Sequence, residues 1–130
     1  MIVVDASAMV ELVLRTAKGR RVADRLKDDG GPCLAPHLVD PDVLQVLREL
    51  VRRREITVER AETAQASFAA FPLNRIPHDV LMNRMWALRD NLTAYDATYV
   101  AIAELRDCPL VTCDGRLSRA SGHRARIELV

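Results

Sequence analysis

The sequence predicts an α/β fold in which a parallel sheet is sandwiched between helices. Short apolar runs alternate with longer segments of helical periodicity, the order that such a sheet requires. The first run, Ile2–Val4, is apolar throughout, as expected of a strand buried on both faces. With 130 residues, 49% of them apolar and 28% charged, the chain has the composition of one globular domain, which we expect to span residues 1–130.

In the first half of the chain, turn residues separate the expected elements. These are a strand over 2–4, helices over 6–14 and 18–27, a strand over 33–35 and an amphipathic helix over 38–54. Gly30-Gly31-Pro32 ends the second helix. The long helix has an apolar face that includes Val43, Leu47 and Leu50. Its start accommodates Pro41, whose missing N–H costs nothing in the first turn, and Asp40 is a natural N-cap.

The second half continues the alternation. The expected elements are a helix over 57–71, a strand over 73–76, helices over 78–89 and 93–106, a strand over 110–112, a short helix after Asp114-Gly115 and a last strand over 127–130. Phe71-Pro72 ends the first of these helices, because a residue before proline avoids helical geometry. Pro109 separates the last long helix from the strand that follows it.

Composition excludes several classes of function. Aromatic residues make up only 4%, which argues against a platform that stacks RNA bases, and a net charge of +1 excludes a uniformly basic nucleic-acid coat. The three cysteines form no C-x-x-C pair, which suits a reducing cytosol. The start of the chain lacks the basic region of a signal peptide, and no apolar run has the length of a membrane span. We therefore expect a cytoplasmic protein.

Four aspartates are placed where a parallel sheet builds its sites. Asp5 and Asp114 each follow a predicted strand, and Asp42 and Asp96 lie in the first turns of predicted helices. Ligands of such sheets bind beyond the carboxyl ends of the strands. Carboxylates gathered there repel one another unless a cation neutralises them, and oxygen ligands select Mg²⁺ or Mn²⁺. Such a site can activate water for attack on a phosphodiester.

Each aspartate also has a purely structural explanation. Asp5 can simply terminate its strand, and Asp114-Gly115 can be a turn. Thr93 and Asp96 fit a capping box, and any acid near the start of a helix, such as Asp42, is favoured by the helix dipole. Spacing alone does not decide between these roles and a metal site.

The chain has no motif for nucleotide binding or for a histidine metal site, but it has three clusters of basic residues. The chain lacks G-x-G-x-x-G and the P-loop, its three histidines have no metal-like spacing, and Trp86 is interpreted as a core or interface residue. Basic residues fall in three clusters: Arg15, Lys18, Arg20, Arg21, Arg25 and Lys27; Arg52, Arg53 and Arg54; and Arg116, Arg119, Arg124 and Arg126. The third follows Asp114 with no acid before Glu128, which suits either a solvated surface or a polyanion-binding one.

Four segments resemble PIN-domain ribonucleases and, more narrowly, the toxin half of VapBC toxin–antitoxin pairs. They are Met1–Ala8 (MIVVDASA), Leu38–Arg48 (LVDPDVLQVLR), Leu92–Glu104 (LTAYDATYVAIAE) and Leu110–Leu117 (LVTCDGRL). The likeness extends from end to end. It implies a three-layer α/β/α sandwich with a central, mainly parallel sheet, and an acidic site that uses Mg²⁺, with Mn²⁺ as a substitute, to cleave RNA.

The resemblance also assigns roles at matching positions. Asp5, Asp96 and Asp114 would be catalytic metal ligands, with Ser7 and Thr112 supporting the pocket. The family's second acid is usually Glu. Here the matching catalytic position is Asp42, whose side chain is one methylene shorter.

As partners, the resemblance implies a cognate antitoxin, a homodimer and an RNA substrate, with tRNA or another structured RNA as the target. Our leading hypothesis is therefore a metal-dependent endoribonuclease toxin. The alternative, prompted by the shorter acid at Asp42, is a catalytically weak RNA- or antitoxin-binding module of the same fold. A DNA-directed nuclease with the same metal chemistry is a third hypothesis.

Overall fold

A computed structural model describes residues 1–130 and contains a five-stranded sheet. Its strands are β1 (Ile2–Val4), β2 (Cys33–Pro36), β3 (Leu73–Ile76), β4 (Leu110–Thr112) and β5 (Ile127–Leu129). They lie in the order β3-β2-β1-β4-β5, and every neighbouring pair is parallel. The predicted α/β fold with its parallel sheet is thus confirmed.

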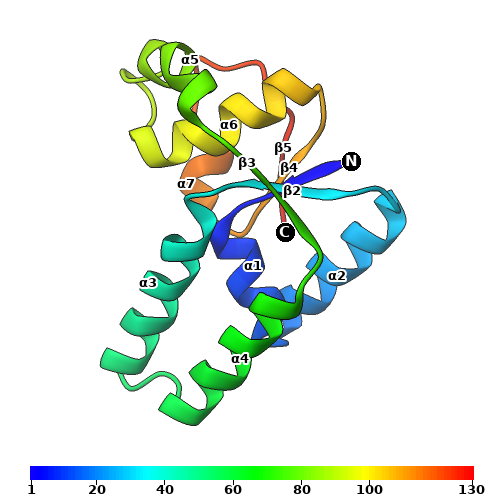
Figure 1. The fold of residues 1–130 in the computed structure, drawn as a ribbon, viewed down its shortest axis with the longest axis vertical. Coiled ribbons are helices and arrows are strands. Elements are labelled where there is room, and N and C mark those ends of the chain that lie inside the picture. The colour runs from blue at the N-terminus through cyan, green and yellow to red at the C-terminus, as the bar shows by residue number, and fades with distance from the viewer.

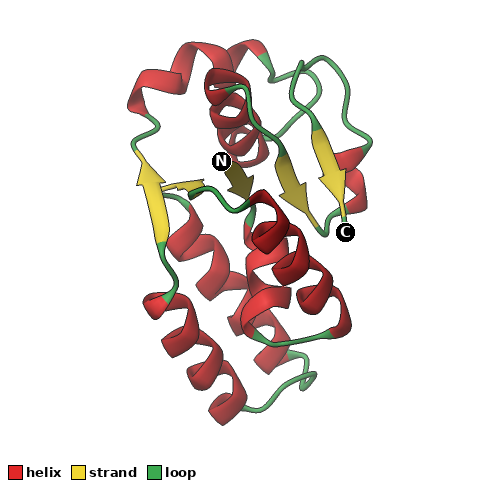
Figure 2. Ribbon diagram, turned by 90° about the vertical axis from the view of Figure 1, so that its right-hand side faces the viewer, coloured by secondary structure: helices red, strands yellow, loops and turns green.

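Seven α-helices and one 3-10 turn connect the strands. They are α1 (Ala6–Val13), α2 (Ala17–Asp29), α3 (Val39–Arg52), α4 (Val58–Ala70), the turn η1 (Asp79–Leu81), α5 (Met82–Ala87), α6 (Ala94–Arg106) and α7 (Gly115–Ser118). Helices α1 to α4 lie on one side of the sheet and α5 and α6 on the other, and α3 and α4 project from the body as a pair (Figures 1 and 2). This is the three-layer arrangement that the resemblance implies.

The core lies where the sheet meets α1 and α6. All three residues of β1 are fully buried, because this central strand is covered on both faces. Helix α6 has seven consecutive buried residues, Ala97 to Ala103, since it is packed between the sheet and α5. Three alanines in that run allow the helix backbone to lie close to the strands. The first turn of α6 is thereby held firmly against the carboxyl end of the sheet.

The region predicted as one helix over 78–89 is divided in two. The 3-10 turn η1 comes first, with the amide of Leu81 donating to the carbonyl of His78 at 3.0 Å, and α5 follows it. No side chain caps either segment, and a helix start without a side-chain cap often satisfies its amides with such tighter bonds. Trp86, interpreted above as a core or interface residue, is 70% exposed in this chain.

The long helix also begins differently from the prediction. The cap position of α3 is Leu38, and Asp40 lies inside the first turn without capping it. Its carboxylate instead accepts hydrogen bonds from the Arg75 guanidinium on β3, at 2.6 to 3.0 Å. A planar guanidinium offers paired donors that a helix amide does not, so the acid is bound across the fold rather than locally.

The strand order creates a switch point between β1 and β4. From β1 the chain moves outward through β2 to β3, and then crosses to the other side of β1 to form β4 and β5. The loops after β1 and β4 therefore leave the sheet side by side in opposite directions, which is where sheets of this kind bind ligands. No helix combines the length and the apolar character needed to cross a membrane.

Candidate active site

Asp5 occupies the switch point. It follows β1 directly, its residue is only 5% exposed, and it is the N-cap of α1, where its Oδ1 accepts from the amide of Ala8 at 2.9 Å. The strand-terminating role and the helix-capping role are thus both present in one side chain. Neither role requires burial, so the position of the carboxylate beneath the surface needs its own explanation.

Two hydroxyl groups hold the carboxylate of Asp5 from either side. Ser7 Oγ donates to Oδ1 at 2.7 Å, and Thr112 Oγ1 donates to Oδ2 at 2.5 Å. Each hydroxyl in turn accepts a backbone amide at 2.9 Å, that of Cys113 for Ser7 and that of Asp114 for Thr112. Ser7 and Thr112, predicted above to support the pocket, therefore contact Asp5 directly, and they join the end of β1 to the end of β4.

This network uses most of the acceptor capacity of Asp5. Oδ1 accepts from Ser7 and Ala8, and Oδ2 accepts from Thr112. A carboxylate has about four acceptor sites, so one remains, on Oδ2. Asp5 can therefore bind a further ligand through a single oxygen.

The carboxyl group of Asp5 has a raised pKa because it is buried without a basic partner. Its pKa is raised from 3.8 to about 6 by burial and, to a smaller extent, by the nearby charge of Asp114, against the opposing effect of the hydrogen bonds from Thr112, Ala8 and Ser7. No arginine or lysine pairs with it. A buried carboxylate in this state gains from any cation that reaches its free oxygen.

Asp96 and Asp114 belong to the same electrostatic cluster. The pKa of Asp96 is raised by burial and then by the charge of Asp114, and the Thr93 side chain and then the charge of Arg116 partly offset this rise. Asp114 caps α7 by accepting from the amide of Arg116 at 2.8 Å, and an Arg116 guanidinium nitrogen lies 3.6 Å from its other oxygen. The amide of Asp96 donates to Thr93 Oγ1 at 3.1 Å, which is half of the predicted capping box. The carboxylate of Asp96 makes no return bond to the Thr93 amide.

Asp42 is held by a residue that the sequence argument did not include. The hydroxyl of Tyr99 donates to Asp42 Oδ2 at 2.8 Å, from a side chain that is only 2% exposed. Burial raises the pKa of Asp42 and the Tyr99 hydrogen bond lowers it, while burial and the charge of Asp42 hold the pKa of Tyr99 far above its usual value of 10. Tyr99 therefore remains a hydrogen-bond donor. Its position three residues after Asp96 on one helix is the signal that could have revealed it.

The donor set suits a hard divalent cation, although the side chains are not drawn together around one. All the candidate ligands are carboxylate oxygens, which favour Mg²⁺ or Mn²⁺ over softer metals. The pKa values of Asp5, Asp42 and Asp96 are raised, chiefly by burial, and the charge of Asp114 contributes to the rises at Asp5 and Asp96. No three acid, histidine or cysteine side chains are grouped closely enough to hold an ion together. The chemistry and the charge fit a cation.

Comparison with known proteins identifies the family. The PIN domain model matches residues 2–122. Ribonuclease VapC12 of Mycobacterium tuberculosis is 42% identical over 130 residues, covering 100% of this chain and 99% of that protein. VapC ribonuclease Mb0985 of Mycobacterium bovis is 38% identical over 132 residues, covering 100% and 98%. The crystal structure of PAE2754 from Pyrobaculum aerophilum shares the fold, with a TM-score of 0.67 at 23% identity over 97% of this chain and 81% of that one.

The end-to-end resemblance noted in the sequence is therefore confirmed by a domain match and by full-length relatives well above 30% identity. The chain belongs to the VapC family of PIN-domain ribonucleases.

Proposed function

We propose that this protein is a metal-dependent endoribonuclease that acts as the toxin of a toxin–antitoxin pair. The observation that carries the proposal is the buried carboxylate of Asp5 at the switch point, without a basic partner and with other acids nearby. Full-length relatives named as VapC ribonucleases support the substrate class and the biological role.

In this proposal Asp5, Asp96 and Asp114 hold Mg²⁺, or Mn²⁺ in its place, and Asp42 assists. A divalent ion bound there supplies Lewis acidity, lowering the pKa of water and offsetting charge on the scissile phosphate. Ser7 and Thr112 hold the carboxylate of Asp5 in place and leave one acceptor site free on Oδ2, which could bind the ion. Tyr99 similarly fixes one oxygen of Asp42 and leaves the other for water or substrate.

The partners follow from the family and from the charge of the site. We propose a cognate antitoxin, a homodimer, a structured RNA such as tRNA as substrate, and an activity in the cytoplasm. Asp5, which has no basic partner, is a natural receptor for a basic side chain, which would compete with the metal there through a charge-assisted contact.

Incubation of the purified, antitoxin-free protein with total RNA and with single-stranded DNA tests the proposal. Reactions contain Mg²⁺, Mn²⁺ or EDTA, with Asp96→Asn alongside as a variant that keeps the shape of the side chain. We expect cuts in RNA that require metal and are absent from the variant. Cutting of DNA alone would assign a DNA-directed nuclease, and full activity of Asp96→Asn would remove this acid from the site.

Asp42 supports the second candidate, a binding module with weak or lost catalysis. The family usually has Glu at this position, and the shorter side chain here is bound by Tyr99. Asp42→Glu separates the two candidates. A large gain in cleavage by this variant supports the binding module, whereas unchanged cleavage indicates that Asp42 suffices.

A further inference from the structure

The connection from β4 to β5 carries a row of arginines across the whole depth of the sheet. Because the two strands are parallel, the chain must return from the carboxyl edge, beside Asp114, to the opposite edge before β5 begins. Residues 115–127 contain four arginines, at positions 116, 119, 124 and 126, and no acid. By contrast, the basic residues of α2 are interspersed with aspartates at positions 24, 28 and 29.

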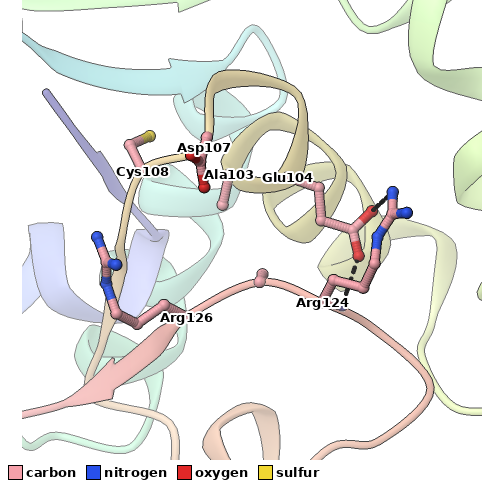
Figure 3. Close-up of a pocket in the computed structure, with 7 residues that line it drawn as sticks. Ala103, Glu104, Asp107, Cys108, Arg124 and Arg126 are labelled. Carbon is pink, nitrogen blue, oxygen red and sulfur yellow. Dashed lines mark hydrogen bonds and ion pairs between the residues drawn. The ribbon is translucent and has the colours of Figure 1, made fainter.

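A recess lies at the far end of this row. It has a volume of about 310 Å³ and is formed between the last turn of α6 and residues 124–126. Figure 3 shows Arg124 and Arg126 at its two ends, with Asp107 and Cys108 on the α6 side. The two arginine side chains are 82% and 67% exposed, so both guanidinium groups face solvent.

The acids around the recess are already paired, with one exception. The side chain of Glu104 is only 5% exposed, and its carboxylate accepts from Arg84 at 2.6 and 2.9 Å and from the backbone amide of Arg124 at 2.8 Å. The guanidinium of Arg124 comes no closer to it than 4.0 Å. Glu128 accepts from Arg25 at 2.6 Å and lies 3.9 Å from Arg126. The cationic ends of Arg124 and Arg126 are thus weakly engaged.

Asp107 is the exception, because it lines the recess and no ion pair or side-chain hydrogen bond neutralises it. It lies at the end of α6 in a left-handed conformation, with φ of 46°. An anion is therefore repelled from the α6 side of the recess and attracted to its arginine side. This asymmetry favours a chain of phosphates lying across the rim over a single anion inside.

The recess lies within reach of an RNA strand that occupies the acid cluster. Asp96 is in the first turn of α6 and Glu104 is eight residues further along, which is about 12 Å at ~1.5 Å per residue. At ~3.4 Å per nucleotide along a helical strand, this corresponds to about three or four nucleotides. Arg116 and Arg119 lie on the connection between the two places.

We propose that Arg124 and Arg126 form a second RNA-binding site, which holds phosphates of the substrate several nucleotides from the cleaved bond. This inference rests on the proposed ribonuclease function. The site contributes affinity but no chemistry, because no acid of the switch point touches it. It favours substrates that continue past the cleavage site as a stem or an ordered strand, as structured RNA does.

Binding of fluorescein-labelled bulk tRNA, measured by anisotropy over a range of KCl concentrations, tests the site. Every protein carries Asp96→Asn and EDTA is present, so that no cleavage occurs. Arg124→Gln/Arg126→Gln should make the slope of log Kd against log salt shallower by about 1.4 to 1.8 and weaken binding about tenfold at physiological salt. Arg124→Lys/Arg126→Lys keeps the charge and should keep most of the slope.

Two further variants sharpen the test. Arg52→Gln/Arg53→Gln removes the same charge from the exposed end of α3 and should leave the slope unchanged. Asp107→Asn, which suits the left-handed backbone, should tighten binding by up to about fivefold. Circular dichroism confirms folding. Should the double Gln variant unfold, Arg126→Gln alone, which loses only a 3.9 Å ion pair, should give half the slope change.

The proposed site is rejected if the double Gln variant keeps the wild-type slope of log Kd against log salt, or if the α3 control loses as much of that slope as the double Gln variant does. Failure of the proposed site can be distinguished from failure of the proposed ribonuclease function. Wild-type protein that cuts RNA while the Gln variants bind normally rejects this site alone. Protein that shows the expected slopes but cuts no RNA with either metal rejects the ribonuclease proposal and supports the site.

Discussion

Replacing Asp5 by Asn should stabilise the metal-free protein at neutral pH. The pKa of Asp5 is raised from 3.8 to about 6, chiefly by burial, so the folded state binds this proton more tightly than the unfolded chain does. Asn keeps the shape of the side chain, can cap α1, and can still accept from Ser7 and Ala8. It carries no charge, and the energetic cost of burying one is therefore removed.

The magnitude and the sign follow from that pKa. A raised carboxyl pKa contributes stability that is fully present below pH 3.8 and is lost as the pH rises through about 6. One pKa unit corresponds to about 1.4 kcal/mol, so the free energy of unfolding that protonated Asp5 contributes falls by about 3 kcal/mol by pH 7.5 but by only about 1 kcal/mol at pH 4.5. The Asn variant loses the bond that Thr112 donates, which costs about 1 to 2 kcal/mol.

We therefore expect Asp5→Asn to gain about 1 to 2 kcal/mol at pH 7.5, or roughly 3 to 6 °C in Tm, and to gain nothing at pH 4.5. Urea unfolding of wild type and variant at both pH values, with EDTA present, measures the difference. Thr112→Val is the control, because it removes the same hydrogen bond, together with the one from the Asp114 amide, while leaving the charge of Asp5. Equal stabilisation at both pH values would refute the assignment to the charge of Asp5.

Three further outcomes are expected. Saturating Mg²⁺ or Mn²⁺ should raise the Tm of wild type, because binding to the folded state adds about 2.7 kcal/mol to the free energy of unfolding at a metal concentration of one hundred times Kd. Scanning calorimetry should show a much smaller increase in Tm for Asp96→Asn. Tyr99→Phe should cost about 1 to 2 kcal/mol of unfolding free energy and lower cleavage, and in a double-mutant cycle with Asp42→Asn the two effects should not add. Arg84→Leu should cost about 2 kcal/mol in urea unfolding, because it leaves the buried carboxylate of Glu104 with one strong donor; Arg52→Leu, on an exposed site, is its control.

The elements were predictable because their signals are local. Gly30-Gly31-Pro32, Phe71-Pro72 and Pro109 divide the chain where the structure does, and the apolar run at β1 identifies the central strand. Parallel strands also send Asp5 and Asp114 to one edge whatever the details of packing. The order of elements alone therefore predicts that these two candidate site residues share an edge of the sheet.

Other features depend on contacts that no local pattern contains. Asp40 is of the residue type that caps helices, but its carboxylate is bound by Arg75, which is 35 residues away. The bond from Tyr99 to Asp42 joins two helices that are separated by 57 positions in the chain. The strand order itself, which makes β1 and β4 neighbours, comes from the crossing between β3 and β4 and is not written in any one segment.

The destabilisation that the buried charge of Asp5 causes and the proposed metal binding by Asp5 have the same physical origin. Hydrogen bonds from Ser7, Thr112 and the Ala8 amide offset only part of the desolvation of a buried charge, because the pKa remains near 6. A cation at the free acceptor site of Oδ2 would supply the missing charge, so the stabilisation by metal and the instability without it should depend on the same atom. Asp5→Asn must then raise the metal-free Tm and reduce the metal-induced increase together. A variant that did only one of these would show that burial strains this acid for a reason other than metal binding.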